Sequence, residues 1–410
     1  MAEVNLTPEL RFPEFEGEWK NQTLFEVAKI TTGNTPSTSK QEYYNGEFFF
    51  VSPADLNDGR YVVRTQTTLS ELGFNSGRRI SKGSTLFVSI GSTIGKVGQT
   101  VCDVITNQQI NALEANELNS DDFIYSLLFK YGPKIRLLAG NQAVPILNKT
   151  DFSNLKFFFP EKEEQQKIAS FLTAIDQRIQ LLQKKKAKLE KYKKGVMQQL
   201  FSQQIRFKDE NGNDFPDWEE KKLGEIGDTF NGLTGKTKVD FGEGKPYVQY
   251  MQIFSNSKVN IKDFGLVKIE ENENQNTVQY GDIFFTTSSE TPNEIGTASV
   301  MLDEVDEVYL NSFCFGFRPN SLTELVPAFS RYLFRSELFR RKIIKLAQGS
   351  TRFNMSKVEL MKLKVLLPKE KEQIKIADFL TSLDGAIEAI EAEICGSMKY
   401  KKGLLQKMFV

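Results

Sequence analysis

The sequence predicts an α+β protein in which two tandem globular domains of mixed α/β structure are each followed by a long helix. Two observations support this prediction: a block of 17 residues occurs twice along the 410-residue chain, and a seven-residue apolar repeat runs from each copy into the residues after it. We expect the two helices to form an antiparallel coiled coil, because two equal repeats related by a pseudo-twofold axis exchange roles.

The clearest repeat pairs residues 160–176 with residues 368–384. The two blocks align without gaps and are identical at ten of 17 positions. At the same offset of 208 residues, the Tyr-Lys-Lys-Gly run that begins at Tyr192 recurs at Tyr400. The residues that precede the two blocks match each other less well, but the matching residues occur in the same order along the chain. The chain is therefore one unit used twice.

This repeat divides the chain into six segments. The stretch from Leu10 to Trp19 resembles the stretch from Ile205 to Trp218, which follows the first helix. We therefore expect the N-terminal segment to pack near the end of the second helix, close to Phe409. The segments are the N-terminal segment (1–19), a first globular domain (20–159), a first long helix (160–202), a linker (203–218), a second globular domain (219–367) and a second long helix (368–410).

Both helices carry an apolar seam with the spacing of a coiled coil. Pro160 and Pro368 precede them, where the missing N–H of proline does no harm. The stretch from Arg178 to Lys194 contains eight basic residues and one acidic residue, and acidic residues of the second helix are expected to face it and fix the register. A solvated helix face and a phosphate-binding face are the two alternatives for its remaining lysines. The seam consists of Ile168, Leu172, Ile175, Ile179, Leu182, Leu189 and Val196 in the first helix, and of Ile376, Leu380, Leu383, Ile387, Ile390, Ile394 and Leu404 in the second.

The composition excludes several classes of chemistry. The chain has no histidine, which rules out Ser/His/Asp triads and HExxH zinc sites. Its three cysteines are scattered, so we expect neither a metal site nor disulfides but thiols in a reducing cytoplasm. The longest stretch without a charged residue has 13 residues, so no membrane span is expected. The 53 basic and 53 acidic residues balance, but this sum conceals local differences in charge.

Within the globular domains, short β-like runs alternate with a few helical stretches. Residues 232–237 resemble a phosphate-binding P-loop, but phenylalanine stands at position 230, where that motif needs glycine, so no nucleotide site is expected. No catalytic residues are predicted. We expect strands at 48–51, 85–90, 283–287 and 313–317, and helices at 121–138 and 327–347.

The loops of both domains are rich in amide, hydroxyl and basic side chains. Such side chains can pair with base edges or bind phosphate, although each loop taken alone also fits a solvated turn. The candidates are Asn34, Thr35, Arg78, Arg79, Ser92, Thr93, Lys96, Asn107, Gln108, Asn141 and Gln142 in the first domain, and Lys236, Lys238, Thr287, Ser288, Asn311, Thr351, Arg352 and Asn354 in the second.

The two repeated blocks share the pattern Pro-x(3)-Glu-Gln-x(2)-Ile-Ala-x-Phe-Leu, which begins at Pro160 and again at Pro368. Two variable domains that alternate with two helices introduced by this pattern resemble the specificity (S) subunit of type I restriction-modification systems. The resemblance covers essentially the whole chain.

The resemblance implies that each globular part is a target recognition domain that reads one half of a bipartite site in double-stranded DNA. The helix pair would set the spacer between the half-sites and dock two methyltransferase (M) subunits, and through them the motor-nuclease (R) subunits. S-adenosylmethionine would be bound by the methyltransferase and not by this chain. Since the two domains match each other poorly, we expect an asymmetric site.

Other functions remain open at this point. A coiled-coil adaptor whose globular domains bind protein and not DNA would fit the same periodicity. A fusion to a single-chain restriction enzyme is disfavoured, because the two repeats occupy all 410 residues.

Overall fold

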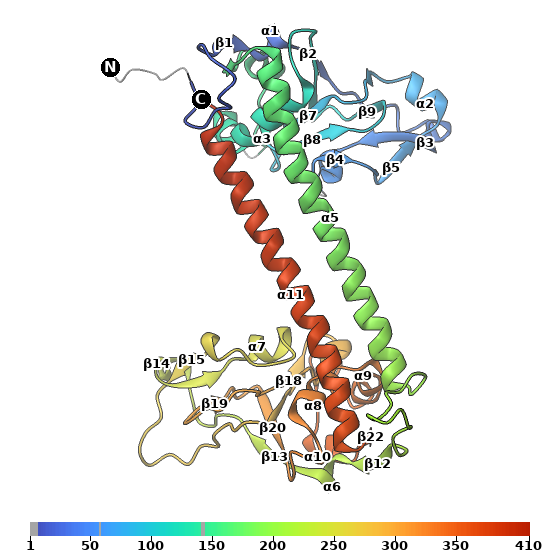
Figure 1. Ribbon diagram of the computed structural model, residues 1–410, viewed down its shortest axis with the longest axis vertical. Helices are drawn as coiled ribbons and strands as arrows, with labels where there is room; N and C mark the ends of the chain where they lie inside the picture. Colours follow the sequence, from blue (N-terminus) through green and yellow to red (C-terminus); the bar gives the residue numbers. More distant parts are fainter. Residues whose placement is uncertain (1–6, 57–58, 141–143) are drawn as a thin grey trace. The chain divides into compact units, whose positions relative to one another are not determined.

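The computed structural model describes residues 7–56, 59–140 and 144–410, and it divides into two compact units. Unit 1 comprises Met1–Lys185 and Ile390–Val410, and unit 2 comprises Lys186–Ala389. The division falls inside both long helices, α5 (Lys162–Phe201) and α11 (Glu370–Lys407) (Figure 1). Each unit therefore contains one globular domain, the first part of one long helix and the last part of the other.

The predicted long helices are confirmed, with 40 residues in α5 and 38 in α11. Both begin in the same way. The side-chain amide of Gln165 donates to the carbonyl of Pro160, and that of Gln373 donates to the carbonyl of Pro368, each at 2.9 Å. At about 1.5 Å per residue, each helix is roughly 60 Å long.

Within each unit the two helix segments pack antiparallel. In unit 1, Lys401 binds Asp176 at 2.5 Å and Arg178 binds Glu393 at 2.6 Å, so the partner number falls as the residue number in α5 rises. In unit 2, Lys193 pairs with Asp384. Arg178 and Lys193 come from the predicted basic stretch. All fourteen predicted seam residues are buried or half-buried.

The two globular domains share a common core of strands in the same order despite their different sequences, and each sheet of the first domain has one additional edge strand, β4 or β6. In the first, the main sheet has the order β2-β10-β7-β8-β4, and in the second it has the order β13-β20-β16-β18. These strands are β2 (Ala28–Thr32), β10 (Ile110–Ala115), β7 (Thr85–Val88), β8 (Val97–Thr100), β4 (Tyr61–Val62), β13 (Gly227–Asn231), β20 (Cys314–Pro319), β16 (Ile283–Thr286) and β18 (Ala298–Val300).

A second sheet in each domain contains one parallel pair, β3 with β9 and β14 with β19. The domains therefore repeat the same fold, and the predicted α+β class is confirmed. The strands are β5 (Thr67–Leu69), β3 (Tyr44–Val51), β9 (Val104–Thr106) and β6 (Arg79–Ile80) in the first domain, and β15 (Gly265–Val267), β14 (Phe241–Val248) and β19 (Tyr309–Leu310) in the second. Shorter pairs are β1 (Lys20–Thr23) with β11 (Lys156–Phe159), β12 (Glu219–Lys222) with β22 (Lys364–Leu367), and β17 (Ser288–Ser289) with β21 (Phe353–Asn354).

The predicted short elements are confirmed with one exception. The helix expected at 121–138 is α3 (Asp121–Arg136) followed by one 3-10 turn. The single helix expected at 327–347 is wrong, because the segment forms α8 (Pro327–Leu333) and α9 (Glu337–Ile344). The break occurs at Ser336, whose side chain accepts a hydrogen bond from the N–H of Phe339 and caps the second helix. No helix within the described residues is long and apolar enough to cross a membrane.

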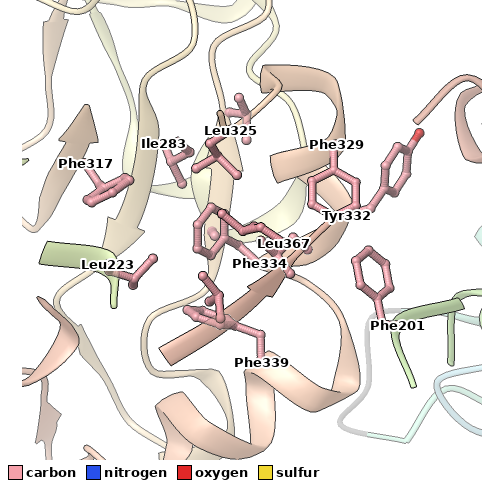
Figure 2. Close-up of a cluster of buried hydrophobic side chains, with 14 of the residues drawn as sticks. Phe201, Leu223, Ile283, Phe317, Leu325, Phe329, Tyr332, Phe334, Phe339 and Leu367 are labelled. Carbon is pink, nitrogen blue, oxygen red and sulfur yellow. The ribbon is translucent and has the colours of Figure 1, made fainter. Parts of the chain in front are cut away.

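Aromatic side chains at the end of each repeat complete the domain cores: Phe201 is the last residue of α5, and Phe409 lies two residues after the end of α11. In unit 1, the ring of Phe409 lies 5.1 Å from that of Phe123 and 6.3 Å from that of Trp19. In unit 2, Phe201 takes the same place beside Phe329 and Trp218, at 5.6 and 6.4 Å (Figure 2). Each domain is therefore packed against the final turn of the helix that belongs to the other repeat.

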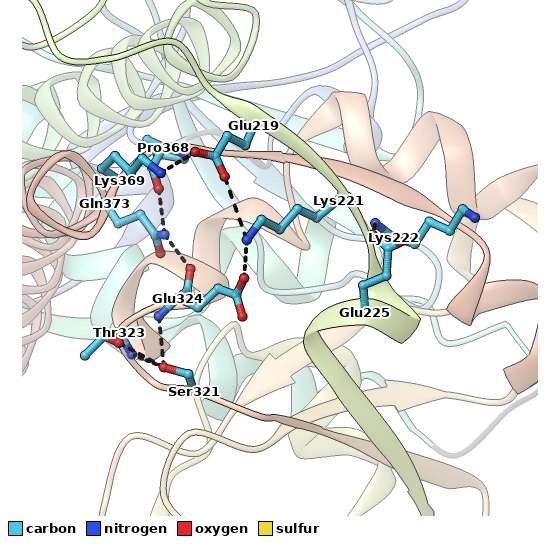
Figure 3. Close-up of polar contacts among 10 residues, drawn as sticks. All are labelled: Glu219, Lys221, Lys222, Glu225, Ser321, Thr323, Glu324, Pro368, Lys369 and Gln373. Carbon is cyan, nitrogen blue, oxygen red and sulfur yellow. Dashed lines mark hydrogen bonds and ion pairs between the residues drawn. The ribbon is translucent and has the colours of Figure 1, made fainter.

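The first turns of the long helices are held by polar contacts. The carbonyl of Glu324 accepts a 2.7 Å hydrogen bond from Gln373, while its carboxylate pairs with Lys221 of β12 (Figure 3). Lys369, just before α11, pairs with Glu219 at the start of β12. These contacts tie the beginning of α11 to the second domain.

A buried carboxylate in the first turns of each long helix binds an arginine from the segment that precedes each domain. In unit 1, Glu164 binds Arg11 through two bonds of 2.8 and 2.7 Å. In unit 2, Glu372, which is completely buried, binds Arg206 at 3.1 and 2.9 Å and also accepts a bond from Trp218. The N-terminal segment also contacts the end of α11, where the N–H of Leu10 donates to the carbonyl of Lys407 at 2.9 Å.

Replacing Arg206 with methionine should destabilise the protein by about 3–5 kcal/mol, because Glu372 would remain buried without a partner charge. The matched control is Lys208→Met, which removes a pair with Asp214 that is 3.9 Å long and exposed, and should cost less than about 1 kcal/mol. Chemical denaturation of the full chain measures both. Equal losses in the two variants would contradict the anchoring role of Arg206.

A circular permutant opened in the exposed turn at 210–212, with its original ends joined by a flexible linker, should fold. The reason is that Leu10 and Lys407 are already hydrogen-bonded in unit 1. Circular dichroism and thermal unfolding check the fold. A permutant that is unfolded with linkers of several lengths would contradict this account of the chain ends.

Candidate nucleic-acid interface

The candidate loops of the first domain meet at one edge of its main sheet. Asn34, just after β2, accepts a 2.6 Å hydrogen bond from the backbone N–H of Arg78. Thr35 donates to the side chain of Gln108 at 2.7 Å. The loop after β7 joins the same group, because the side chain of Gln109 donates to the carbonyl of Ile90 at 3.4 Å. Four loops that are far apart in sequence thus form one polar surface.

Equivalent asparagines organise this edge in both domains. The side chain of Asn107 accepts a bond from the N–H of Gln109, and that of Asn311 accepts a bond from the N–H of Phe313. Their backbone N–H groups donate to the ends of β3 and β14, at the carbonyls of Val51 and Val248. Asn107 and Asn311 thus each form an Asx turn, in which the side chain accepts a hydrogen bond from the backbone N–H two residues later, as asparagine favours.

A glycine after the first strand of each main sheet lets the backbone pass close to that turn. A Cβ atom on Gly33 would lie 2.2 Å from the carbonyl oxygen of Asn107, and one on Gly232 would lie 2.2 Å from that of Asn311. Gly232 is the first residue of the P-loop-like run. Its role is therefore close packing, and the run continues into a single 3-10 turn (Lys238–Asp240) and not into a long helix.

Other first-domain candidates are placed as follows. Arg79 is exposed but binds Asp103, at 2.9 Å from its Nε, and this hydrogen bonding lowers the pKa of Asp103. Ser92 is exposed, and Thr93 and Lys96 are half-buried in a loop of successive turns. Asn141 and Gln142 lie outside the described residues.

Six of the second-domain candidates gather around β17 and β21. Ser288 pairs with Asn354 across the two strands, and the hydroxyl of Thr287 donates to the carbonyl of Phe313 at 2.6 Å. Among the described residues, no hydrogen bond or ion pair joins Lys236 or Lys238 to this group. The six residues are Thr287, Ser288, Asn311, Thr351, Arg352 and Asn354.

The proposed contact role of Lys236 is wrong in this structure. Its side chain is only 4% exposed and pairs with Glu273, which lowers the pKa of that carboxyl. Burial with a partner charge removes it from any solvent-facing surface. Lys238, two residues later, is exposed and remains a candidate contact residue.

Two residues of the second-domain surface were missed by the sequence reasoning. Phe313, predicted as the first residue of a strand, precedes β20 and is 55% exposed. Lys357 donates to the side chain of Asn231, and burial lowers the pKa of Lys357. The position of Phe313 directly after the polar pair Asn311-Ser312 was the available signal. In the described part of the chain, no group of three or more acidic or cysteine side chains could hold a metal ion.

A family model described as the type I restriction modification DNA specificity domain matches this chain twice, at residues 16–191 and 216–395. The chain belongs to this family. The resemblance expected from the repeated blocks is thereby confirmed. Relatives named as specificity subunits also support the expectation of a non-catalytic subunit.

Individual relatives extend this result. The MjaVIII specificity subunit of Methanocaldococcus jannaschii is 25% identical and covers 97% of this chain and 92% of its own length. The EcoR124I/EcoR124II specificity subunit of Escherichia coli is 31% identical over 41% of this chain and 43% of its own. The solved S subunit from M. genitalium has a TM-score of 0.61, 19% identity and coverage of 98% and 99%, and so shares the fold.

Substituting alanine for Gly232 should lower the free energy of unfolding by about 1–3 kcal/mol and weaken DNA binding, because the new Cβ would collide with the turn at Asn311. The matched control is Gly195→Ala, since nothing lies within 4 Å of a Cβ at that position in α5. It should stabilise the helix by about 0.5–1 kcal/mol. Thermal unfolding and a DNA-binding titration measure the two effects, and a neutral Gly232→Ala would contradict the close approach.

Proposed function

We propose that this specificity subunit directs a type I restriction-modification complex in the cytoplasm to an asymmetric bipartite DNA site, with one half-site read by each globular domain. The observation that carries the proposal is that both domains repeat one topology but place different side chains on the same sheet edge. A shared topology implies a shared role, and different side chains imply different bases.

The chemistry of the two edges supports an asymmetric site. The first domain presents Asn34, Gln108 and the exposed Arg78. The second presents Arg352 beside Phe313. Amide side chains suit adenine and guanidinium groups suit guanine, so the two surfaces favour different base sequences. The adaptor alternative finds no support in the family match, which is to a DNA specificity domain.

The two long helices would set the number of base pairs between the half-sites. Each helix contributes residues to both units, and the apolar seam between the helices has few polar interruptions. The length of the helix pair would therefore set the length of the spacer. Insertion of a whole heptad preserves the seam, whereas any other length rotates the helix face.

The helical regions would also dock two methyltransferase subunits, which would bind S-adenosylmethionine and recruit the motor-nuclease subunits. Large side chains remain exposed on both helices. Tyr192 and Tyr400, which occupy equivalent repeat positions, are 53% and 58% exposed. A duplicated surface of this kind supports two copies of one partner.

Insertion of one heptad into each helix, in the same repeat position, should lengthen the spacer by about 10 Å, or roughly three base pairs, and leave both half-sites unchanged. Methylation mapping in cells that carry the variant with its partner subunits measures spacer and half-sites together. A variant with the original spacer but altered half-sites would contradict this role of the helix pair.

A further inference from the structure

Several basic side chains of the second domain are already engaged by protein groups. Lys236 is buried with Glu273, and Lys357 donates to Asn231. Arg318 binds Asp282 at 2.8 and 2.7 Å. Arg352 differs, because it is exposed and pairs with no carboxylate in the described residues. Its guanidinium has one long hydrogen bond, of 3.4 Å, to the hydroxyl of Ser288.

A tight turn holds Arg352 at the surface. The backbones of Gln348 and Asn354 exchange hydrogen bonds of 3.0 and 2.8 Å, which closes the turn below the arginine. Gly349 adopts a φ of 127°, and a Cβ there would lie 2.2 Å from the carbonyl oxygen of Arg352. The turn therefore requires glycine at position 349. Its backbone sets the position of the Cα atom of Arg352.

An aromatic ring lies beside the guanidinium of Arg352. The guanidinium of Arg352 lies over the ring of Phe313, 5.9 Å from its centre. A cation–π contact favours one placement of an arginine side chain and leaves its N–H groups able to bind a second partner. Both Phe313 and Arg352 are exposed, so these N–H groups are accessible to a ligand.

Among the described residues of the first domain, the position equivalent to Arg352 carries an apolar side chain. The N–H of Leu147 donates to Ser89, as that of Met355 donates to Thr287, which aligns the two segments. The residue three positions before Met355 is Arg352, and the residue three positions before Leu147 is Val144, which is 55% exposed. An apolar side chain cannot donate a hydrogen bond to a base edge. At this position the second domain therefore has a hydrogen-bond donor and the first domain has none.

We propose that Arg352 reads a guanine in the half-site bound by the second domain, by donating two hydrogen bonds to O6 and N7 in the major groove. This inference rests on the proposed function. The guanidinium of Arg352, which is exposed beside the ring of Phe313, carries paired N–H donors that match the two acceptors of guanine, whereas a phosphate contact needs only charge.

The decisive variant is Arg352→Lys, which keeps the charge and removes the two-pronged geometry. The complete complex with its methyltransferase subunits is used, and methylation mapping of the unmodified protein first defines both half-sites. Binding is then titrated on duplexes that carry each of the four bases at every guanine of the site. Arg341→Lys is the matched control, since Arg341 is exposed on α9 and pairs with Glu337 of its own helix.

The expected result is that Arg352→Lys loses about 5- to 140-fold of its preference for guanine at one position of one half-site, which corresponds to one lost bidentate contact. The other half-site and the Arg341→Lys control should be unchanged, and thermal unfolding of both variants should match the parent. Arg352→Gln should show the same loss at the same position.

Two results would overturn the inference. One is a uniform loss of affinity on all duplexes, or no loss, with base preference intact at every position, since a phosphate contact or no contact would then explain Arg352. The other is a parent site whose half-sites contain no guanine. A parent complex that binds without any sequence preference would instead overturn the proposed function itself.

Discussion

The structure depends on the exchange of helix ends between the two repeats. Phe201 ends the helix of the first repeat but completes the core of unit 2, where it meets Trp218 and Phe329. Phe409, two residues after the helix of the second repeat, completes the core of unit 1. Because large buried aromatics contribute several kcal/mol each, neither domain has a full core without the helix of the other repeat.

Buried ion pairs add directional contacts to this exchange. Glu164 and Glu372 bind Arg11 and Arg206, so the start of each helix is fixed to the segment that precedes the domain. The two copies differ in one respect, since the indole N–H of Trp218 donates to Glu372, whereas that of Trp19 has no partner among the described residues. A rigid framework of this kind allows the loops at the sheet edges to vary in sequence without loss of the fold.

The framework was predictable from the sequence because its signals are local and repeated. The heptad positions from Ile168 to Val196 and the matched blocks at Pro160 and Pro368 specify the helices without knowledge of tertiary contacts. The break at Ser336 was missed, because the apolar pattern of 327–347 continues across a capping residue. Apolar periodicity records burial and does not record where a backbone turns.

The candidate interface was only partly predictable. Residue types identified polar loops, but the contacts that join Asn34 with Arg78, or place Arg352 over Phe313, span many residues and arise only in the folded domain. The burial of Lys236 with Glu273 is likewise a tertiary contact that composition cannot reveal.

Methylation mapping of the unmodified chain with its partner subunits tests most directly whether two different reading surfaces act from one shared framework. This account predicts two unlike half-sites separated by one fixed number of unspecified base pairs. A palindromic site, or a single uninterrupted recognition sequence, would contradict it.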